Sequence, residues 1–133
     1  MTDSETLEKV REMFRNDRYA TETGAVIDEI DDHYAKVSLT ITEHHKNAMG
    51  GVMGGVYFTL ADFAFAVASN WQKVGVVAIN TCVSFIGVPK TERIIAEAVL
   101  VKDGRSTCSY NVTVTDENGA PVAIVQCLGF HKS

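Results

Sequence analysis

The sequence lacks the motifs by which several functional classes are recognised. It holds no Cys-x-x-Cys pair, no Cys/His cluster with zinc spacing and no Gly-x-Ser-x-Gly nucleophile elbow. Its net charge is −5, and its Arg and Lys residues are scattered. Because phosphate binding needs clustered basic side chains, this balance argues against nucleic acid as the main partner.

Signals for secretion or membrane insertion are also missing. The first five residues, Met1 to Glu5, are acidic and polar, unlike a secretory signal. The longest apolar stretch is interrupted by Asp62 and ends at Ser69, so it is too short and too polar for a membrane span. An odd number of cysteines suits a reducing compartment: Cys82, Cys108 and Cys127. We therefore expect a cytoplasmic protein without a membrane partner.

Helical and strand-like patterns follow one another in a simple order. Thr2 and Glu5 have capping-box spacing, and the apolar residues after them predict a short helix to about Asn16. A second apolar run predicts a long central helix from about Gly54 to Gln72. Alternating or β-rich runs predict strands over residues 24–30, 33–41, 76–86, 93–102, 105–115 and 122–131. Two dipeptides predict hairpin turns between the last three strands: Asp103-Gly104 and Asn118-Gly119.

The segregation of one long helix from a series of antiparallel strands indicates an α+β fold in one domain of 133 residues. Strands of about ten residues span roughly 30 Å, and a helix of about 18 residues covers nearly the same length. We expect a curved antiparallel sheet wrapped around the central helix. One face of the sheet and its edges stay uncovered in that arrangement, which favours self-association.

Asp62 is the one charged residue in the middle of the central apolar helix. A carboxyl group is almost never fully buried without a partner, because the ionised form is costly in a low-dielectric site. Two interpretations follow from the burial alone. The group is either a structural carboxylate held by backbone donors or a reactive carboxylate in a site.

The helix that carries Asp62 opens with Gly54-Gly55. The first N–H groups of a helix are free of internal partners and lie at the positive end of its dipole. Glycine lets a ligand approach the backbone closely. Such a helix end can polarise a carbonyl whose oxygen becomes negative in a transition state. The alternative is that the glycines only permit tight turning or close packing.

The order Asn-x5-Met-Gly-Gly-x6-Asp, over residues 47–62, is followed by Thr81-x3-Phe85-x3-Pro89. This pattern resembles the hotdog-fold acyl-CoA thioesterases of the phenylacetate-pathway (PaaI-like) type. The resemblance covers about residues 22–131. It implies a single hotdog domain over residues 1–133, with an N-terminal helix and lead-in over 1–20 and the hotdog core over 21–133.

The resemblance also implies the roles of several residues. Asp62 is expected to be the general base or nucleophile, the Gly54 N–H to polarise the thioester carbonyl, and Asn47 to orient water or substrate. By the same resemblance the substrate is expected to be an aryl-CoA or a short- or medium-chain acyl-CoA, and no metal or other cofactor is expected. The site is expected at the interface of a homodimer or homotetramer, with Asn47 and Asp62 from different subunits.

Two further residues, Arg105 and Ser106, resemble the family's Gly-Arg segment. Arg105 is a candidate contact for the CoA phosphates, since a planar guanidinium suits phosphate; a solvated strand-end arginine is the alternative. Gly55 and Met53 are expected beside the substrate.

The chain departs from the family at two positions. Met53 replaces the usual His before Gly-Gly, and Ala78 replaces a Ser or Thr that can hold the catalytic water. These losses leave open a catalytically weak or silent acyl-CoA-binding protein. The hydratase/dehydratase group on the same fold is disfavoured, because the central helix carries no His.

Overall fold

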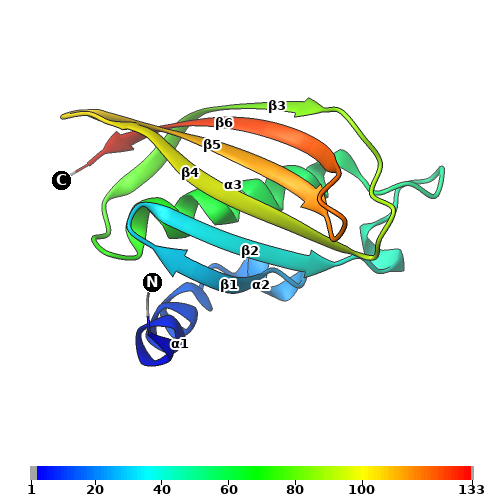
Figure 1. Ribbon diagram of the computed structural model, residues 1–133, viewed down its shortest axis with the longest axis horizontal. Helices are drawn as coiled ribbons and strands as arrows, with labels where there is room; N and C mark the ends of the chain where they lie inside the picture. The colour runs from blue at the N-terminus through cyan, green and yellow to red at the C-terminus, as the bar shows by residue number, and fades with distance from the viewer. Residues whose placement is uncertain (1–2, 133) are drawn as a thin grey trace.

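The computed structural model describes residues 3–132 and shows one curved sheet around a long helix (Figure 1). The helices are α1 (Ser4–Phe14), α2 (Arg18–Glu22), the 3₁₀ turn η1 (Glu43–His45) and α3 (Gly54–Asn70). The strands are β1 (Val26–Asp31), β2 (Tyr34–Thr40), β3 (Val76–Phe85), β4 (Arg93–Asp103), β5 (Thr107–Asp116) and β6 (Pro121–His131).

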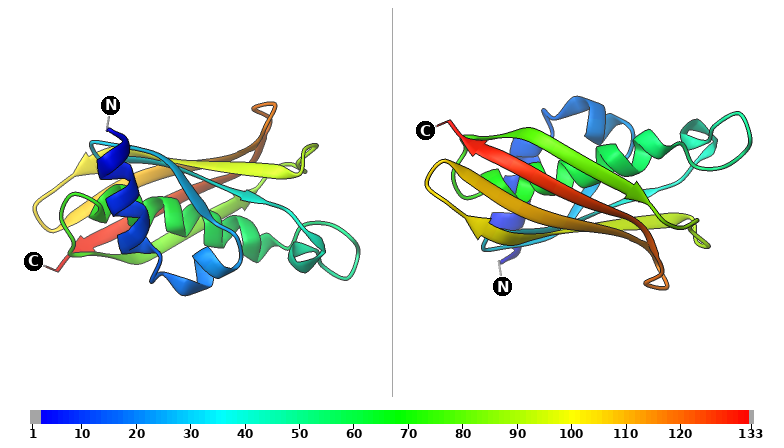
Figure 2. Two further views of the ribbon diagram at one scale, coloured as in Figure 1. Left: turned by 90° about the horizontal axis from the view of Figure 1, so that it is seen from below. Right: turned by 90° about the horizontal axis from the view of Figure 1, so that it is seen from above.

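The six strands form one antiparallel sheet in the order β1-β2-β4-β5-β6-β3. The crossover from β2 through α3 to β3 carries the chain from one side of the sheet to its far edge. Figure 2 shows α3 lying along the sheet, with α1 and α2 on its other side near the β1 edge. The predicted α+β hotdog architecture is confirmed.

The core lies between α3 and the concave face of the sheet. Eight residues of α3 are buried: Tyr57, Leu60, Ala61, Phe63, Ala64, Phe65, Val67 and Ala68. Small alanines beside large rings let the helix approach the strands closely, and alternate residues of β4 and β5 point toward it. This wrapping explains why α3 is apolar on most sides.

The edge strand β3 is exposed along most of its length. Its apolar side chains Val77, Ile79 and Phe85 are 42%, 54% and 57% exposed. Within this single chain the sheet edge at β3 is uncovered, as the sequence led us to expect. An exposed apolar edge of this length is a template for pairing with another chain.

The helix boundaries differ slightly from the sequence prediction. The predicted cap Thr2 lies outside the described residues, and Asp3 caps α1 by accepting a hydrogen bond from the Thr6 N–H at 2.8 Å. α1 ends at Phe14 and α3 at Asn70, two residues earlier than predicted in each case. α2 was not predicted, because five residues, mostly polar, give no readable helical period.

The strands are confirmed to within two residues, except at the first hairpin turn. β4 runs on to Asp103, and β5 begins only at Thr107. The turn is therefore the three-residue segment 104–106, closed by the Gly104 N–H donating to Thr107 O at 2.8 Å, and not the two-residue Asp103-Gly104 turn. A register shift near Lys102 absorbs the difference.

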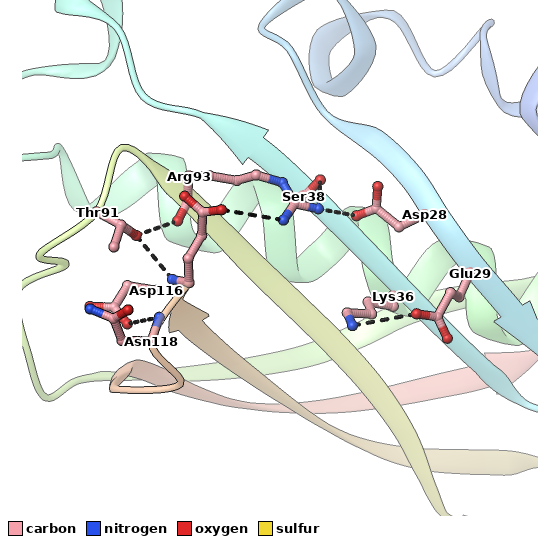
Figure 3. A network of polar contacts seen from close by, with 9 residues as sticks. Asp28, Glu29, Lys36, Ser38, Thr91, Arg93, Asp116 and Asn118 are labelled. Atoms are coloured by element: carbon pink, nitrogen blue, oxygen red, sulfur yellow. Dashed lines mark hydrogen bonds and ion pairs between the residues drawn. The ribbon is translucent and has the colours of Figure 1, made fainter.

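A polar network fixes the end of the sheet nearest the loop that enters α3 (Figure 3). The Arg93 guanidinium donates to Ser38 Oγ at 3.1 Å and to Asp28 Oδ2 at 3.2 Å, which joins β4 to β2 and β1. Asp116 is buried and accepts the backbone N–H groups of Lys90, Asn118 and Ala120. These hydrogen bonds lower the pKa of Asp116 and hold the β5–β6 turn.

Candidate active site

Asp62 faces a hollow of about 400 Å³ between α3 and the segment around α2. Its walls are formed by Asp17, Tyr19, Ala20, Gly55, Phe58, Thr59, Asp62 and Phe63. Gly55, Thr59 and Asp62 recur at helical spacing, so one face of α3 provides most of the lining. The helix thus presents a single acid to a mainly apolar recess.

The Asp62 carboxylate has no partner that would hold it in place. It is half-buried, and no hydrogen bond or ion pair joins it to any residue between positions 3 and 132. Burial raises the pKa of Asp62, and the negative charge of Asp17 raises it further. The structural interpretation needs backbone donors that the described residues do not supply. An unpaired, partly desolvated carboxylate is available for proton transfer.

The N-terminus of α3 is open. Its N-cap residue is Met53, and no side chain accepts a hydrogen bond from the first turn. The Phe85 ring lies over Gly54, 3.1 Å from where a Cβ would stand. The Met53 methyl group lies 2.5 Å from the corresponding point on Gly55. Both glycines therefore allow apolar side chains to approach the helix start closely.

Asn47 organises the loop that enters α3. Its Oδ1 accepts the N–H groups of Met49 at 2.9 Å and Gly51 at 3.1 Å. A bridge between Lys46 and Val52 closes the loop at its base, and Figure 1 shows the loop projecting from the body. The carbonyl oxygen of the amide is thus used inside the loop, which leaves the Nδ2 donors for another molecule.

His45 anchors the same loop to the body. It is buried, its Nδ1 accepts the Thr42 N–H at 2.9 Å, and its Nε2 donates to Thr23 O at 2.8 Å. Both ring nitrogens are satisfied by backbone groups, so the ring is a structural element of the loop. His44 is exposed beside it.

One chain does not bring the expected catalytic groups together. Gly54 and Asp62 are eight residues apart on α3, which is roughly 12 Å at 1.5 Å per residue. A carbonyl held at Gly54 is therefore beyond the reach of Asp62 of the same chain. Asn47 lies in the projecting loop and does not line the hollow of Asp62.

Arg105 and Ser106 lie at the other end of α3. The His131 N–H donates to Ser106 O at 2.9 Å, and the Lys132 N–H donates to Gly75 O at 2.8 Å, just past the helix. Both candidate CoA contacts are exposed and distant from Gly54 in the same chain. Ala78 is exposed on β3, at a register shift opposite β6.

Several residues of these surfaces were not among the predicted site residues, and three of them stand out. Asp17 and Tyr19 line the hollow of Asp62, and Phe85 covers Gly54. Phe85 belongs to the Thr81-x3-Phe85-x3-Pro89 pattern, so the sequence held a signal that could have placed it in the site. Asp17 and Tyr19 come from the unpredicted α2 region, and nothing in their spacing connects them to Asp62.

No group of potential metal ligands includes Asp62 within the part of the chain that the structure describes. Nor is any helix between residues 3 and 132 both long and apolar enough to cross a membrane.

Comparison with known proteins gives the family. Residues 49–123, more than half of the chain, match the family model of the thioesterase superfamily. The chain belongs to the thioesterase superfamily. The matched segment contains α3 with Asp62 and Gly54, and it makes this protein a thioester hydrolase.

The thioesterase is similar to proteins of bacteria and archaea along most of its length. It is 30% identical over 113 residues to Escherichia coli acyl-coenzyme A thioesterase PaaI, covering 84% of this chain and 81% of that protein. It is 32% identical over 125 residues to an Archaeoglobus fulgidus protein named "Putative esterase". That match covers 92% of this chain and 81% of that protein.

The fold agrees with the same relationship. The solved structure of E. coli PaaI, from the phenylacetic acid degradation operon, matches with a TM-score of 0.88 at 26% identity. The match covers 96% of this chain and 94% of that chain. The thioesterase is thus a PaaI-like hotdog protein from its N-terminal helices to its last strand.

Proposed function

We propose that the thioesterase hydrolyses acyl-CoA thioesters, with Asp62 as general base or nucleophile. The observation that carries the proposal is the unpaired carboxylate of Asp62 in an apolar hollow. Burial raises the pKa of Asp62, which makes its carboxylate a better proton acceptor than an exposed one. The similarity to a named acyl-coenzyme A thioesterase supports the substrate class.

In the hydrolysis, Asp62 removes a proton from water as the water oxygen attacks the thioester carbonyl. The carbonyl oxygen becomes negative and accepts the Gly54 N–H at the positive end of α3. The carbon–sulfur bond then breaks, and the proton held on Asp62 passes to the CoA thiolate. The products are the free acid and CoA. In the nucleophilic variant, the Asp62 oxygen attacks first, and water cleaves the resulting anhydride.

The active site of the proposal is shared by two subunits. Asp62 of one chain lies too far from its own Gly54, so a partner's helix start and Asn47 loop complete the site. The exposed apolar β3 edge supports a homodimer, and the uncovered face of the sheet supports a further pairing into a homotetramer.

The acyl group enters the hollow lined by Phe58, Phe63 and Tyr19. These rings favour aryl or short- to medium-chain acyl groups. Met53, with Gly55 beside it, and Ala78 add apolar contact where the family often has polar side chains. Arg105 and Ser106 contact the CoA phosphates. They come from the subunit whose β4–β5 turn faces the site. The reaction needs no metal or other cofactor.

The proposal treats residues 1–133 as one hotdog domain in the cytoplasm. The three cysteines are free thiols in the structure, which supports a reducing compartment.

A thiol-release assay against a panel of aryl- and fatty-acyl-CoAs tests the activity. We expect turnover of at least one panel member, with aryl or short- to medium-chain acyl groups preferred. The alternative, a silent acyl-CoA-binding protein, predicts no thiol release together with thermal stabilisation by the same esters.

Light scattering tests the assembly. We expect a dimer or tetramer at micromolar concentration. A stable monomer that still turns over substrate would contradict the shared site.

A further inference from the structure

Three potential metal ligands converge at the end of α3 that is far from Asp62, and a fourth lies beside them. Asp103, Cys108 and His131 each place one donor atom within 4.8 Å of the others. His33 lies beside this group of three, with its Nε2 3.9 Å from Asp103 Oδ2. The four residues come from the β1–β2 turn, the end of β4, the start of β5 and the end of β6.

The spacing of the donor atoms brackets that of a zinc site. His131 Nε2 lies 2.7 Å from Asp103 Oδ1, and the other donors lie somewhat farther apart. A tetrahedral Zn²⁺ with bonds of about 2.0–2.3 Å holds its ligand atoms about 3.3–3.6 Å apart. Coordination therefore requires side-chain rotations that replace the His131–Asp103 hydrogen bond with bonds to the ion.

Two of the ligands are oriented by outer contacts. His33 Nδ1 lies 3.1 Å from the Tyr110 hydroxyl, which leaves Nε2 directed to Asp103. The Gly129 N–H donates to the Cys108 sulfur. Such second contacts fix the ring orientation and the thiolate position in protein metal sites.

The surroundings also favour a cation. A hollow of about 220 Å³ opens onto the cluster and is lined by His33, Asp103 and His131 together with the last turn of α3. The C-terminal end of a helix carries the negative end of its dipole. Asp32 adds a carboxylate 3.8 Å from His33 Nε2, while Lys73 in the same lining opposes it.

The His33 backbone is held in an uncommon conformation. Its φ is 50°, in the left-handed region where Asn, Asp and His are the non-glycine residues most often found. This turn conformation places the His33 imidazole beside Asp103.

A reactive Cys-His-Asp group is a less suitable interpretation of the same residues. Burial raises the pKa of the Cys108 thiol, and the Asp103 charge raises it further. A nucleophilic cysteine needs a lowered pKa without help from a metal, whereas a bound cation itself deprotonates a coordinating thiol. In addition, Cys108 is buried, with only 2% of its surface exposed.

We propose that Asp103, Cys108, His131 and His33 form a structural Zn²⁺ site that links β4, β5, β6 and the β1–β2 turn. The set of two imidazoles, one thiolate and one carboxylate consists of preferred zinc ligands. The site is closed by four protein groups and takes no part in hydrolysis. The sequence spacing does not reveal it, because His33 is 70 residues before Asp103.

Cobalt substitution tests the site in the full-length protein. Co²⁺ titrated into metal-free protein is expected to give the intense d–d absorption of tetrahedral cobalt and a thiolate-to-cobalt charge-transfer band. Zn²⁺ is expected to remove both bands at one equivalent per chain and to raise the unfolding temperature. A weak octahedral cobalt spectrum would overturn the proposal.

Substitutions at single residues distinguish the proposed ligands from other residues of the chain. Cys108→Ser is expected to abolish the charge-transfer band, and Tyr110→Phe to weaken Zn²⁺ binding about 10- to 100-fold through His33. Cys82→Ser, which removes an exposed thiol outside the cluster, is the matched control and keeps both bands. If Cys108→Ser retains the wild-type spectrum, the proposal is wrong.

Discussion

Asp17 and Asp62 face the same hollow from different parts of the fold. Asp17 is the N-cap residue of α2, yet its side chain makes no capping hydrogen bond, and Asp62 lies in the middle of α3. The charge of Asp17 adds to burial in raising the pKa of Asp62. Two like charges in one recess are typical of sites in which one carboxyl group exchanges protons.

Replacing Asp17 tests this electrostatic relationship. Asp17→Asn removes a negative charge and nearly preserves the shape, so the pKa of Asp62 falls toward its ordinary value. The acidic limb of the kcat/KM profile is then expected to move to lower pH, with turnover retained at neutral pH. The pH profile of thiol release measures the shift; an unmoved limb would show that Asp17 does not act on the reacting group.

The raised pKa of Asp62 also predicts a dependence of stability on pH. A carboxyl group whose pKa is higher in the folded than in the unfolded state favours folding most when it is protonated. That stability is fully present below the unfolded value of about 3.9 and is lost as pH rises through the folded pKa. Asp62→Asn is therefore expected to raise the unfolding temperature at pH 7, and to lose this gain near pH 4. Thermal unfolding at several pH values measures both; equal stability throughout would contradict the burial cost.

Substitution of Gly129 tests the packing of the core. A Cβ there would lie 2.7–2.9 Å from Val76, Phe65 and Cys108. Gly129→Ala is expected to destabilise the fold by about 1–3 kcal/mol, because the core cannot absorb the added methyl group without strain. Gly51→Ala is the control, since its nearest contact would be Asn47 at an ordinary 3.7 Å. Urea unfolding measures the two free energies, and equal losses would refute the packing argument.

Mixing two impaired variants tests the shared site. Asp62→Asn and Asn47→Ala are each expected to be strongly impaired as homodimers. After subunit exchange at equal amounts, half of the dimers are mixed, and each mixed dimer has one intact site of two. Thiol release should recover to about a quarter of the wild-type value. No recovery would place both residues in a site within one chain, and full activity of Asn47→Ala alone would refute its role.

The fold was readable from the sequence because its signals were long and regular. The apolar run of α3 and the alternation in β2 and β5 predicted their elements to within two residues. Short elements were not predicted from the sequence. α2 is held by packing against α3 and not by a helical period, and its absence from the prediction hid one wall of the hollow.

The site was only partly readable for a related reason. Asn47, Gly54 and Asp62 could be found because their spacing resembles a family pattern within one segment. Tertiary structure brings Asp17 to Asp62, and it also brings together Asp103, Cys108 and His131. The spacing of these residues along the sequence does not indicate either arrangement.

The kcat of Asp62→Asn on the best acyl-CoA substrate, measured beside Asp17→Asn, tests the central claim most directly. Both variants make the same chemical change in the same hollow. We expect Asp62→Asn to lose about 10²- to 10⁴-fold in kcat while it remains folded and binds the ester. Asp17→Asn should keep turnover near the wild-type value. Wild-type turnover by Asp62→Asn would show that this carboxylate is not the reacting group.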